Sequence, residues 1–175
     1  MLDVAVTLAC EWPEGDEAAW EARCLAAVRA GMEVTPFAAM AGAGGAVAEV
    51  SVRLTDDAEV HALNRTWRDK DRPTNVLSFP QVQPDLLGVI GNADDGELLL
   101  GDIVLARETC VAEAGEKGVA LAAYVSHLVV HGTLHLLGYD HLDDDEADRM
   151  EDLERAAMAS LGLGDPYASD FRLTD

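Results

Sequence analysis

The chain has 175 residues, of which 49% are hydrophobic, and its 33 acidic side chains against 12 basic ones give a formal net charge of −21. This length and composition fit one domain over residues 1–175 with a substantial core. No apolar run approaches the roughly 20 residues that a membrane-spanning helix needs. Such acidity argues against a protein that binds nucleic acid over its whole surface. Four of the basic residues nevertheless fall within eight positions, namely Arg65, Arg68, Lys70 and Arg72.

The three cysteines, Cys10, Cys24 and Cys110, are widely spaced and form no paired motif. Their pattern predicts reduced, packed thiols in a cytoplasmic protein. The N-terminus lacks a basic leader and carries Asp3, so it is a poor signal peptide.

Hydrophobic periodicity predicts the elements of the first half of the chain. These are a strand over 2–9, a helix over 17–30, a flexible break at 41–45, a strand over 46–54 and a helix over 56–68. Asp16 and Thr55 are expected to cap the two helices, and Gly31 to follow the end of the first. The inner face of the second helix is expected to hold Val60, Leu63 and Trp67.

The second half is predicted to contain a strand over 75–79, an exposed loop over 81–96, a strand over 98–105 bent or bulged at Gly101, and helices ending at 117, 137 and 161. The middle of these helices, 120–137, is mostly apolar and therefore expected to be a buried central helix. Asp143 is expected to cap the last helix, and the final ten residues to form a mobile tail. The fold class is α+β: a small mixed sheet of about four strands covered by helices.

The most informative segment is Ser126–His141, which contains four of the five histidines. His127, His131 and His135 are spaced four residues apart and therefore share one face of the predicted helix. One metal ion cannot bind all three, because the helical rise separates the outer two by about 12 Å, whereas Zn–N bonds measure about 2.0–2.1 Å. One adjacent pair must bind, with a third ligand from elsewhere.

Gly138 indicates which pair binds. It lies three residues after His135, where a residue in the left-handed conformation can end the helix and turn the chain back. This turn predicts that His141 comes beside His131 and His135, in the spacing H-x3-H-x5-H. Three neutral imidazoles leave a zinc ion an open fourth position, where a bound water ionises at about pH 7. The sequence therefore predicts one zinc ion per chain and a hydrolase.

This spacing also matches the zinc-protease motif H-E-x-x-H-x-x-G-x-x-H, with one departure. Gly132 occupies the position of the glutamate that serves proteases as general base. A peptidase without this carboxylate lacks its proton carrier, so peptide hydrolysis is disfavoured. A structural zinc site, which is closed by four protein ligands, would more commonly include cysteine ligands, and none lies nearby in the sequence. For His127 two readings stay open: simple packing, or a role beside the metal or substrate.

The segment His127–His141 closely resembles the signature of the YbeY family, the bacterial rRNA-maturation metallo-endoribonucleases. Further matching blocks are Leu63–Arg65, Arg68–Asp71, Thr74–Pro80, Leu100–Ile103, Leu161–Gly162 and Asp165–Tyr167. They follow one another in the expected order, and the resemblance covers roughly residues 46–167. The first 45 residues carry no such motif.

This resemblance implies a zinc-dependent, single-strand-specific endoribonuclease in the cytoplasm, which acts in 16S rRNA 3′-end maturation and in quality control of defective ribosomes. It implies His131, His135 and His141 as zinc ligands and Arg68 as a functional arginine. The implied partners are single-stranded rRNA, the small ribosomal subunit and ribosome-associated proteins. A role for Arg68 agrees with chemistry, since a guanidinium can hold two phosphoryl oxygens in a planar grip.

Two other functions remain in competition. A non-catalytic ribosome-assembly factor, whose zinc only holds the fold, suits the acidic surface at least as well. A zinc metalloprotease is disfavoured by Gly132. The general base is left open, with Asp140 as one group that could orient an imidazole or accept a proton. Nickel or another imidazole-binding metal would also fit the three histidines.

Overall fold

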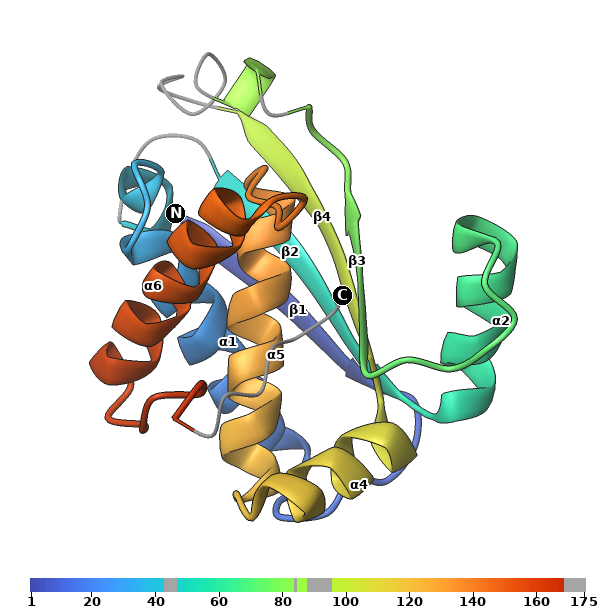
Figure 1. The fold of residues 1–175 in the computed structure, drawn as a ribbon. Helices are drawn as coiled ribbons and strands as arrows, with labels where there is room; N and C mark the ends of the chain where they lie inside the picture. The colour runs from blue at the N-terminus through green and yellow to red at the C-terminus, as the bar shows by residue number, and fades with distance from the viewer. Residues whose placement is uncertain (43–46, 84, 88–95, 169–175) are drawn as a thin grey trace.

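The structure is a computed structural model, and it describes residues 1–42, 47–83, 85–87 and 96–168 (Figure 1). Its strands are β1 (Leu2–Leu8), β2 (Val47–Thr55), β3 (Val76–Pro80) and β4 (Glu97–Ala106). Its helices are α1 (Glu17–Glu33), the short 3-10 helix η1 (Ala38–Ala41), α2 (Asp57–Arg68), α4 (Arg107–Lys117), α5 (Leu121–Leu136) and α6 (Asp144–Ser160).

The four strands form one mixed sheet in the order β1-β2-β4-β3. β1, β2 and β4 are mutually parallel, while β3 pairs antiparallel with β4 at the edge of the sheet. The predicted alternation of β2 is confirmed, since its inward residues are buried and the residues between them are only partly covered. The α+β class and the small mixed sheet are therefore as expected from the sequence.

The predicted irregularity at Gly101 is confirmed as a bulge. Glu49 pairs with Leu99 but the next residue of β2, Val50, pairs with Gly101, so β4 carries one extra residue. Gly101 has a φ of +147°, and a Cβ atom there would lie 2.3 Å from the carbonyl oxygen of Phe79. The bulge therefore requires glycine at this position.

Helices α1, α5 and α6 lie on one side of the sheet and α2 on the other (Figure 1). α5 runs through the middle of this helical layer and contacts both β3 and β4. Gly132 allows close approach here: a Cβ atom at this position would lie 3.0 Å from Ser78 Oγ and 3.1 Å from Ile103 Cγ2. Almost every residue of α5 is buried, which confirms the predicted central helix.

Several local expectations are wrong. Asp56, not Thr55, caps α2, since its carboxylate accepts the backbone N–H of Glu59 at 2.9 Å. α1 continues through Gly31 to Glu33. Trp67 was expected to face inward but is 70% exposed, because α2 covers only part of the sheet through Val60 and Leu63.

The expected exposed loop and mobile tail are each partly wrong. Residues 85–87 of the loop are helical, and Leu87 is fully buried in the main core; residues 84 and 88–95 lie outside the described part. In the expected tail, Tyr167 is buried with 7% exposure, because it packs against α5 and α6. Residues 169–175, and residues 43–46 of the expected break, lie outside the described residues.

No single helix of the described residues is long and apolar enough to cross a membrane. Within the same residues, α4 and α5 taken together reach the required length and hydropathy, but they meet at a bend of 112°. All three cysteines are free thiols, as predicted. Cys24 and Cys110 are buried, and burial raises the pKa of the Cys24 thiol to about 12.

Candidate metal centre

The three histidines of the predicted site come from α5 and from the turn that follows it. His131 and His135 lie one turn apart near the end of the helix. Gly138, with a φ of +95°, then reverses the chain. Its N–H donates to the His135 carbonyl at 3.0 Å and the Tyr139 N–H to the Leu134 carbonyl at 3.0 Å, the pattern of a Schellman motif. The turn expected from Gly138 is therefore present.

This turn brings His141 back beside the helix. One nitrogen from each of His131, His135 and His141 can be chosen so that all three lie within 4.8 Å of one another. The ring centroids are 4.6 Å apart for His131 and His135, and 5.2 Å for His135 and His141. Three nitrogen donors this close are a group that could hold a metal ion.

The hydrogen bonds of the imidazoles favour a cation between them. The Nδ1 atom of His135 faces the Tyr139 carbonyl at 2.9 Å, and that of His131 faces a Glu154 carboxylate oxygen at 2.6 Å. Because both partners are acceptors, each Nδ1 carries the proton and each Nε2 has a lone pair. The two Nε2 atoms nevertheless lie 3.1 Å apart. Two nitrogens bound to one zinc ion, each about 2.0–2.1 Å from it, lie at a comparable separation.

His141 supplies a third nitrogen that could bind the same metal ion. Its Nε2 atom is buried and has no hydrogen-bond partner within the described residues. A buried polar atom without a partner is costly, and coordination to a metal would remove that cost. The residues present therefore fit a metal ion of the kind that prefers imidazole nitrogen.

Sequence reasoning missed Glu154. This residue of α6 is fully buried, and its Oε1 lies 2.6 Å from His131 Nδ1 and 3.3 Å from His127 Nε2. Burial alone would raise the pKa of the Glu154 carboxyl, but the interactions with His127 and His131 outweigh it and hold that pKa well below its usual range. The sequence signal was a glutamate at an inward position of the last helix, four residues after Met150.

His127 is a neighbour of the cluster rather than a member. It is buried, and burial lowers the pKa of its imidazole, which favours the neutral form. Its Nε2 faces Glu154, and its ring packs edge-on against Tyr167 with centroids 5.2 Å apart. His127 thus packs in the core and contacts the carboxylate behind His131, while a role beside a metal or substrate stays a prediction.

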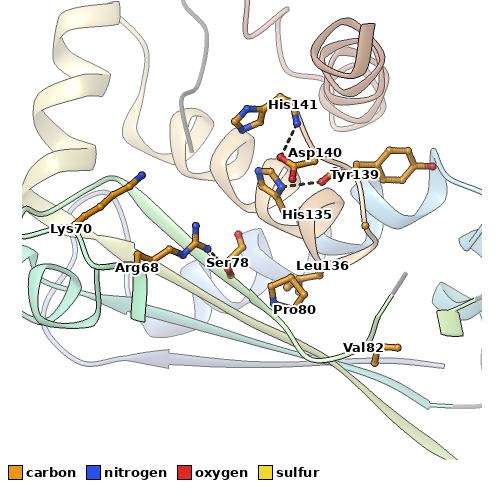
Figure 2. Close-up of a pocket in the computed structure, with 11 residues that line it drawn as sticks. Arg68, Lys70, Ser78, Pro80, Val82, His135, Leu136, Tyr139, Asp140 and His141 are labelled. Atoms are coloured by element: carbon orange, nitrogen blue, oxygen red, sulfur yellow. Dashed lines mark hydrogen bonds between the residues drawn. The ribbon is translucent and has the colours of Figure 1, made fainter. Parts of the chain in front are cut away.

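A cleft of about 400 Å³ opens beside the histidines. Figure 2 shows His135 and His141 on one wall, with Arg68 and Lys70 reaching in from the other, and Ser78 between them. Asp140 also lines the cleft, where its Oδ1 accepts the backbone N–H of His141 at 2.8 Å. The cleft therefore joins imidazole nitrogens, cationic side chains and one carboxylate in a single open space.

Arg68 is the last residue of α2, and its position is held by the chain around it. Its Nη2 donates to the Ser78 carbonyl at 2.5 Å, and its guanidinium lies 5.6 Å from the centre of the Phe79 ring. The turn after it is tied down by Asn64, a buried residue whose side-chain amide donates to the Arg72 carbonyl at 2.8 Å. Asn64 thereby places the basic stretch at the mouth of the cleft.

The other basic residues of the stretch differ in their surroundings. Lys70 lines the cleft. Arg65 has a side chain 64% exposed and lies 4.0 Å from the Asp71 carboxylate, so part of its charge is already offset. The local basic patch expected from the sequence thus contributes mainly Arg68 and Lys70 to this cleft.

Comparison with known proteins agrees with this site. Residues 18–162 match the model of the family described as Endoribonuclease YbeY, so the match begins well before the residue 46 expected from the motifs. The Endoribonuclease YbeY of Rhizorhabdus wittichii is 61% identical over 168 residues, which cover 96% of this chain and 98% of that protein. That of Sphingopyxis alaskensis is 62% identical over the same shares.

Among solved structures, the solution structure of TM1509 from Thermotoga maritima covers 98% of both chains with a TM-score of 0.51. At 21% identity this similarity concerns the fold alone. The family match covers most of the chain and includes the three histidines and Arg68. On this evidence the chain belongs to the endoribonuclease YbeY family.

Proposed function

We propose that the protein is a zinc-dependent endoribonuclease specific for single-stranded RNA, with His131, His135 and His141 as the ligands of one zinc ion. The observation that carries this proposal is the convergence of the three imidazoles at the wall of a cleft whose opposite wall holds Arg68. The family relationship supports it, because the relatives named above are called endoribonucleases.

The three imidazoles suit a catalytic metal better than a structural one. Three protein ligands with an adjoining open space are typical of catalytic zinc sites, whereas structural sites are closed by four ligands. When bound, zinc would supply Lewis-acid chemistry at a phosphodiester in the cleft. His135 and His141 themselves line that space, so a substrate there meets the metal centre directly.

Arg68 is proposed to stabilise the negative charge that builds on the phosphoryl oxygens during cleavage. Its guanidinium is anchored to Ser78 and stacked near Phe79, so little side-chain entropy is lost when it grips a phosphate. Lys70 would add a second, less directional positive charge at the same cleft. An open cleft of this modest volume suits one flexible strand better than a rigid duplex.

The metalloprotease alternative meets a steric objection as well as a chemical one. Gly132 occupies the position of the protease glutamate, and even a Cβ atom there would press on Ser78 and Ile103. A glutamate side chain has no room at this point of the helix–sheet contact. Gly132 therefore belongs to the packing of α5 against the sheet.

The non-catalytic alternative, an assembly factor with a structural metal, is separable by experiment. For the cellular role we propose 16S rRNA 3′-end maturation and ribosome quality control in the cytoplasm, with the small ribosomal subunit and its associated proteins as partners. This part of the proposal draws on the family resemblance. The whole chain, 1–175, is proposed to act as one domain.

The test compares the wild type with His135→Ala and Arg68→Ala. Metal content is measured by mass spectrometry, folding by circular dichroism, and cleavage with a fluorescent single-stranded RNA and the matching duplex. About one zinc per chain is expected in the wild type and in Arg68→Ala, but not in His135→Ala. Both variants should stay folded and lose at least about tenfold in cleavage rate, and the duplex should resist.

Wild-type cleavage that survives in His135→Ala would reveal a contaminating nuclease and overturn the proposal. Unfolding of His135→Ala together with metal loss would favour the structural-metal alternative instead. Chelator-sensitive hydrolysis of an unfolded protein would favour the metalloprotease.

A further inference from the structure

The carboxylate of Glu154 lies at the centre of a buried polar group behind the metal centre. The side chain comes from α6, is fully buried, and reaches across to α5. Oε1 faces His131 Nδ1 at 2.6 Å, and Oε2 accepts a hydrogen bond from the Tyr167 hydroxyl at 2.5 Å. His127 Nε2 makes a longer contact of 3.3 Å to Oε1. Burying a carboxylate is costly, so a position that keeps one must satisfy it from several sides.

Tyr167 is itself held in place from outside this group. Its backbone N–H donates to Asp165 Oδ1 at 2.8 Å, and the Arg155 guanidinium lies 5.4 Å from the centre of its ring. Arg155 also contacts Asp165 at 3.3 Å. The short segment after α6 is thus folded back onto the helix, and its aromatic ring closes the space behind Glu154.

We propose that Glu154 is a positioning residue that fixes the protonation site and orientation of His131, and that Tyr167 acts through Glu154 to complete the metal centre. The inference deepens the proposed function, because it rests on the zinc site assigned there. An acceptor at Nδ1 leaves the proton on that nitrogen and directs the Nε2 lone pair toward His135 and His141. A carboxylate in this place also makes the imidazole a stronger ligand.

Glu154→Gln gives the sharpest variant, since it keeps the size of the side chain. A glutamine has one acceptor oxygen where the carboxylate has two. If that oxygen takes the Tyr167 hydroxyl, its NH₂ group faces His131 and favours the proton on Nε2, where it blocks the metal. Tyr167→Phe removes only the hydroxyl. Asp145→Asn is the matched control, because it removes one carboxylate from the same helix at an exposed position.

Two readouts are measured on the full chain without RNA. The first is the zinc dissociation constant from competition with a chromophoric chelator. The second is the set of imidazole nitrogen chemical shifts of the metal-free protein, with the His131 signals assigned by their loss in His131→Ala. Circular dichroism of the metal-free variants reports on folding.

We expect Glu154→Gln to weaken zinc binding by about 10–100-fold and to move the His131 proton toward Nε2. Tyr167→Phe should shift both readouts in the same direction by less. In the double variant the glutamine oxygen is released from the Tyr167 hydroxyl and can accept the His131 N–H, so the double variant should be no more impaired than Glu154→Gln alone. Asp145→Asn should behave like the wild type.

The proposal is overturned if folded Glu154→Gln keeps the wild-type zinc affinity and His131 proton, or if the effects of the two substitutions simply add. If Glu154→Gln does not fold, Tyr167→Phe decides: unchanged zinc affinity and unchanged His131 shifts in that variant reject the proposal. If the wild type itself binds no zinc, the proposed function fails together with this inference, whereas zinc binding that ignores Glu154 rejects the inference alone.

Discussion

At the scale of single residues, two glycines allow the central helix to approach the sheet. A Cβ atom at Gly101 would meet both the Phe79 carbonyl oxygen at 2.3 Å and the Leu136 side chain of α5 at 2.8 Å. Gly132 makes the reciprocal contact from the helix toward β3 and β4. The distance between α5 and the sheet, and with it the place of His131 and His135, depends on the absence of a side chain at these two positions.

Gly101→Ala tests this contact. The substitution combines an unfavourable φ with a clash against rigid backbone, so it should lower the free energy of unfolding by about 2–4 kcal/mol. Gly115→Ala is the control, because that glycine lies in α4 with nothing within 4 Å of the added atom; it should stabilise by about 1 kcal/mol. Urea denaturation measures both, and equal stabilities for the two variants would contradict the packing argument.

At the scale of secondary structure, His141 lies between two helix ends. The turn at Gly138 ends α5 on one side, and Asp143 begins α6 on the other, where its carboxylate accepts the Glu146 N–H at 2.8 Å. The Glu146 carboxylate in turn accepts the Leu142 N–H at 3.2 Å. These local bonds hold the short connection that carries the third histidine.

Asp143→Ala should therefore cost about 1 kcal/mol of stability through loss of the helix cap. Asp143→Asn should recover most of it, because asparagine also caps helices well. Thermal and urea unfolding of the metal-free proteins measure the difference. An alanine variant as stable as the wild type would show that the cap contributes nothing to this connection.

The elements also show where periodicity misleads. Trp67 sits at helical spacing from Val60 and Leu63, so the pattern predicts one inward stripe. Only part of this stripe is buried, because α2 is the one helix of the described residues on its side of the sheet and extends past the surface it covers (Figure 1). Periodicity indicates which residues share a helix face, but not how far the neighbouring element reaches.

At the scale of the whole molecule, the charge is large and unevenly distributed. The formal net charge is −21, while Arg68 and Lys70 both line the cleft beside the histidines. Net charge of this size destabilises a compact chain through self-repulsion. The same field would repel RNA from most of the surface, so we expect the proposed substrate to approach at the cleft.

Salt should accordingly stabilise the protein. Raising NaCl from 10 mM to 0.5 M shortens the screening length several-fold and should raise the melting temperature of the metal-free protein by roughly 2–4 °C, equivalent to about 1 kcal/mol. KCl should act equally if screening is the cause. A melting temperature that is flat or falls with salt would show that self-repulsion is not significant in the folded state.

Local patterns in the sequence were enough to predict the strands, most helices, the bulge at Gly101 and the grouping of His131, His135 and His141. Each depends on residues close in the chain: alternation within a strand, one helical turn between two histidines, and a left-handed glycine that turns the chain back toward them at the third. Such short-range geometry follows from backbone sterics and hydrogen bonding, whatever the rest of the molecule does.

Only the tertiary structure decided that Glu154 lies behind His131, that Tyr167 closes the group, and that Arg68 faces the histidines across a cleft. These contacts connect α5 with α2, with α6 and with the segment after α6. Local sequence patterns do not predict which of these elements pack against one another. Their physical basis is long-range packing: an inward glutamate, or a tyrosine after the last helix, makes these contacts only when a particular face of another helix covers it.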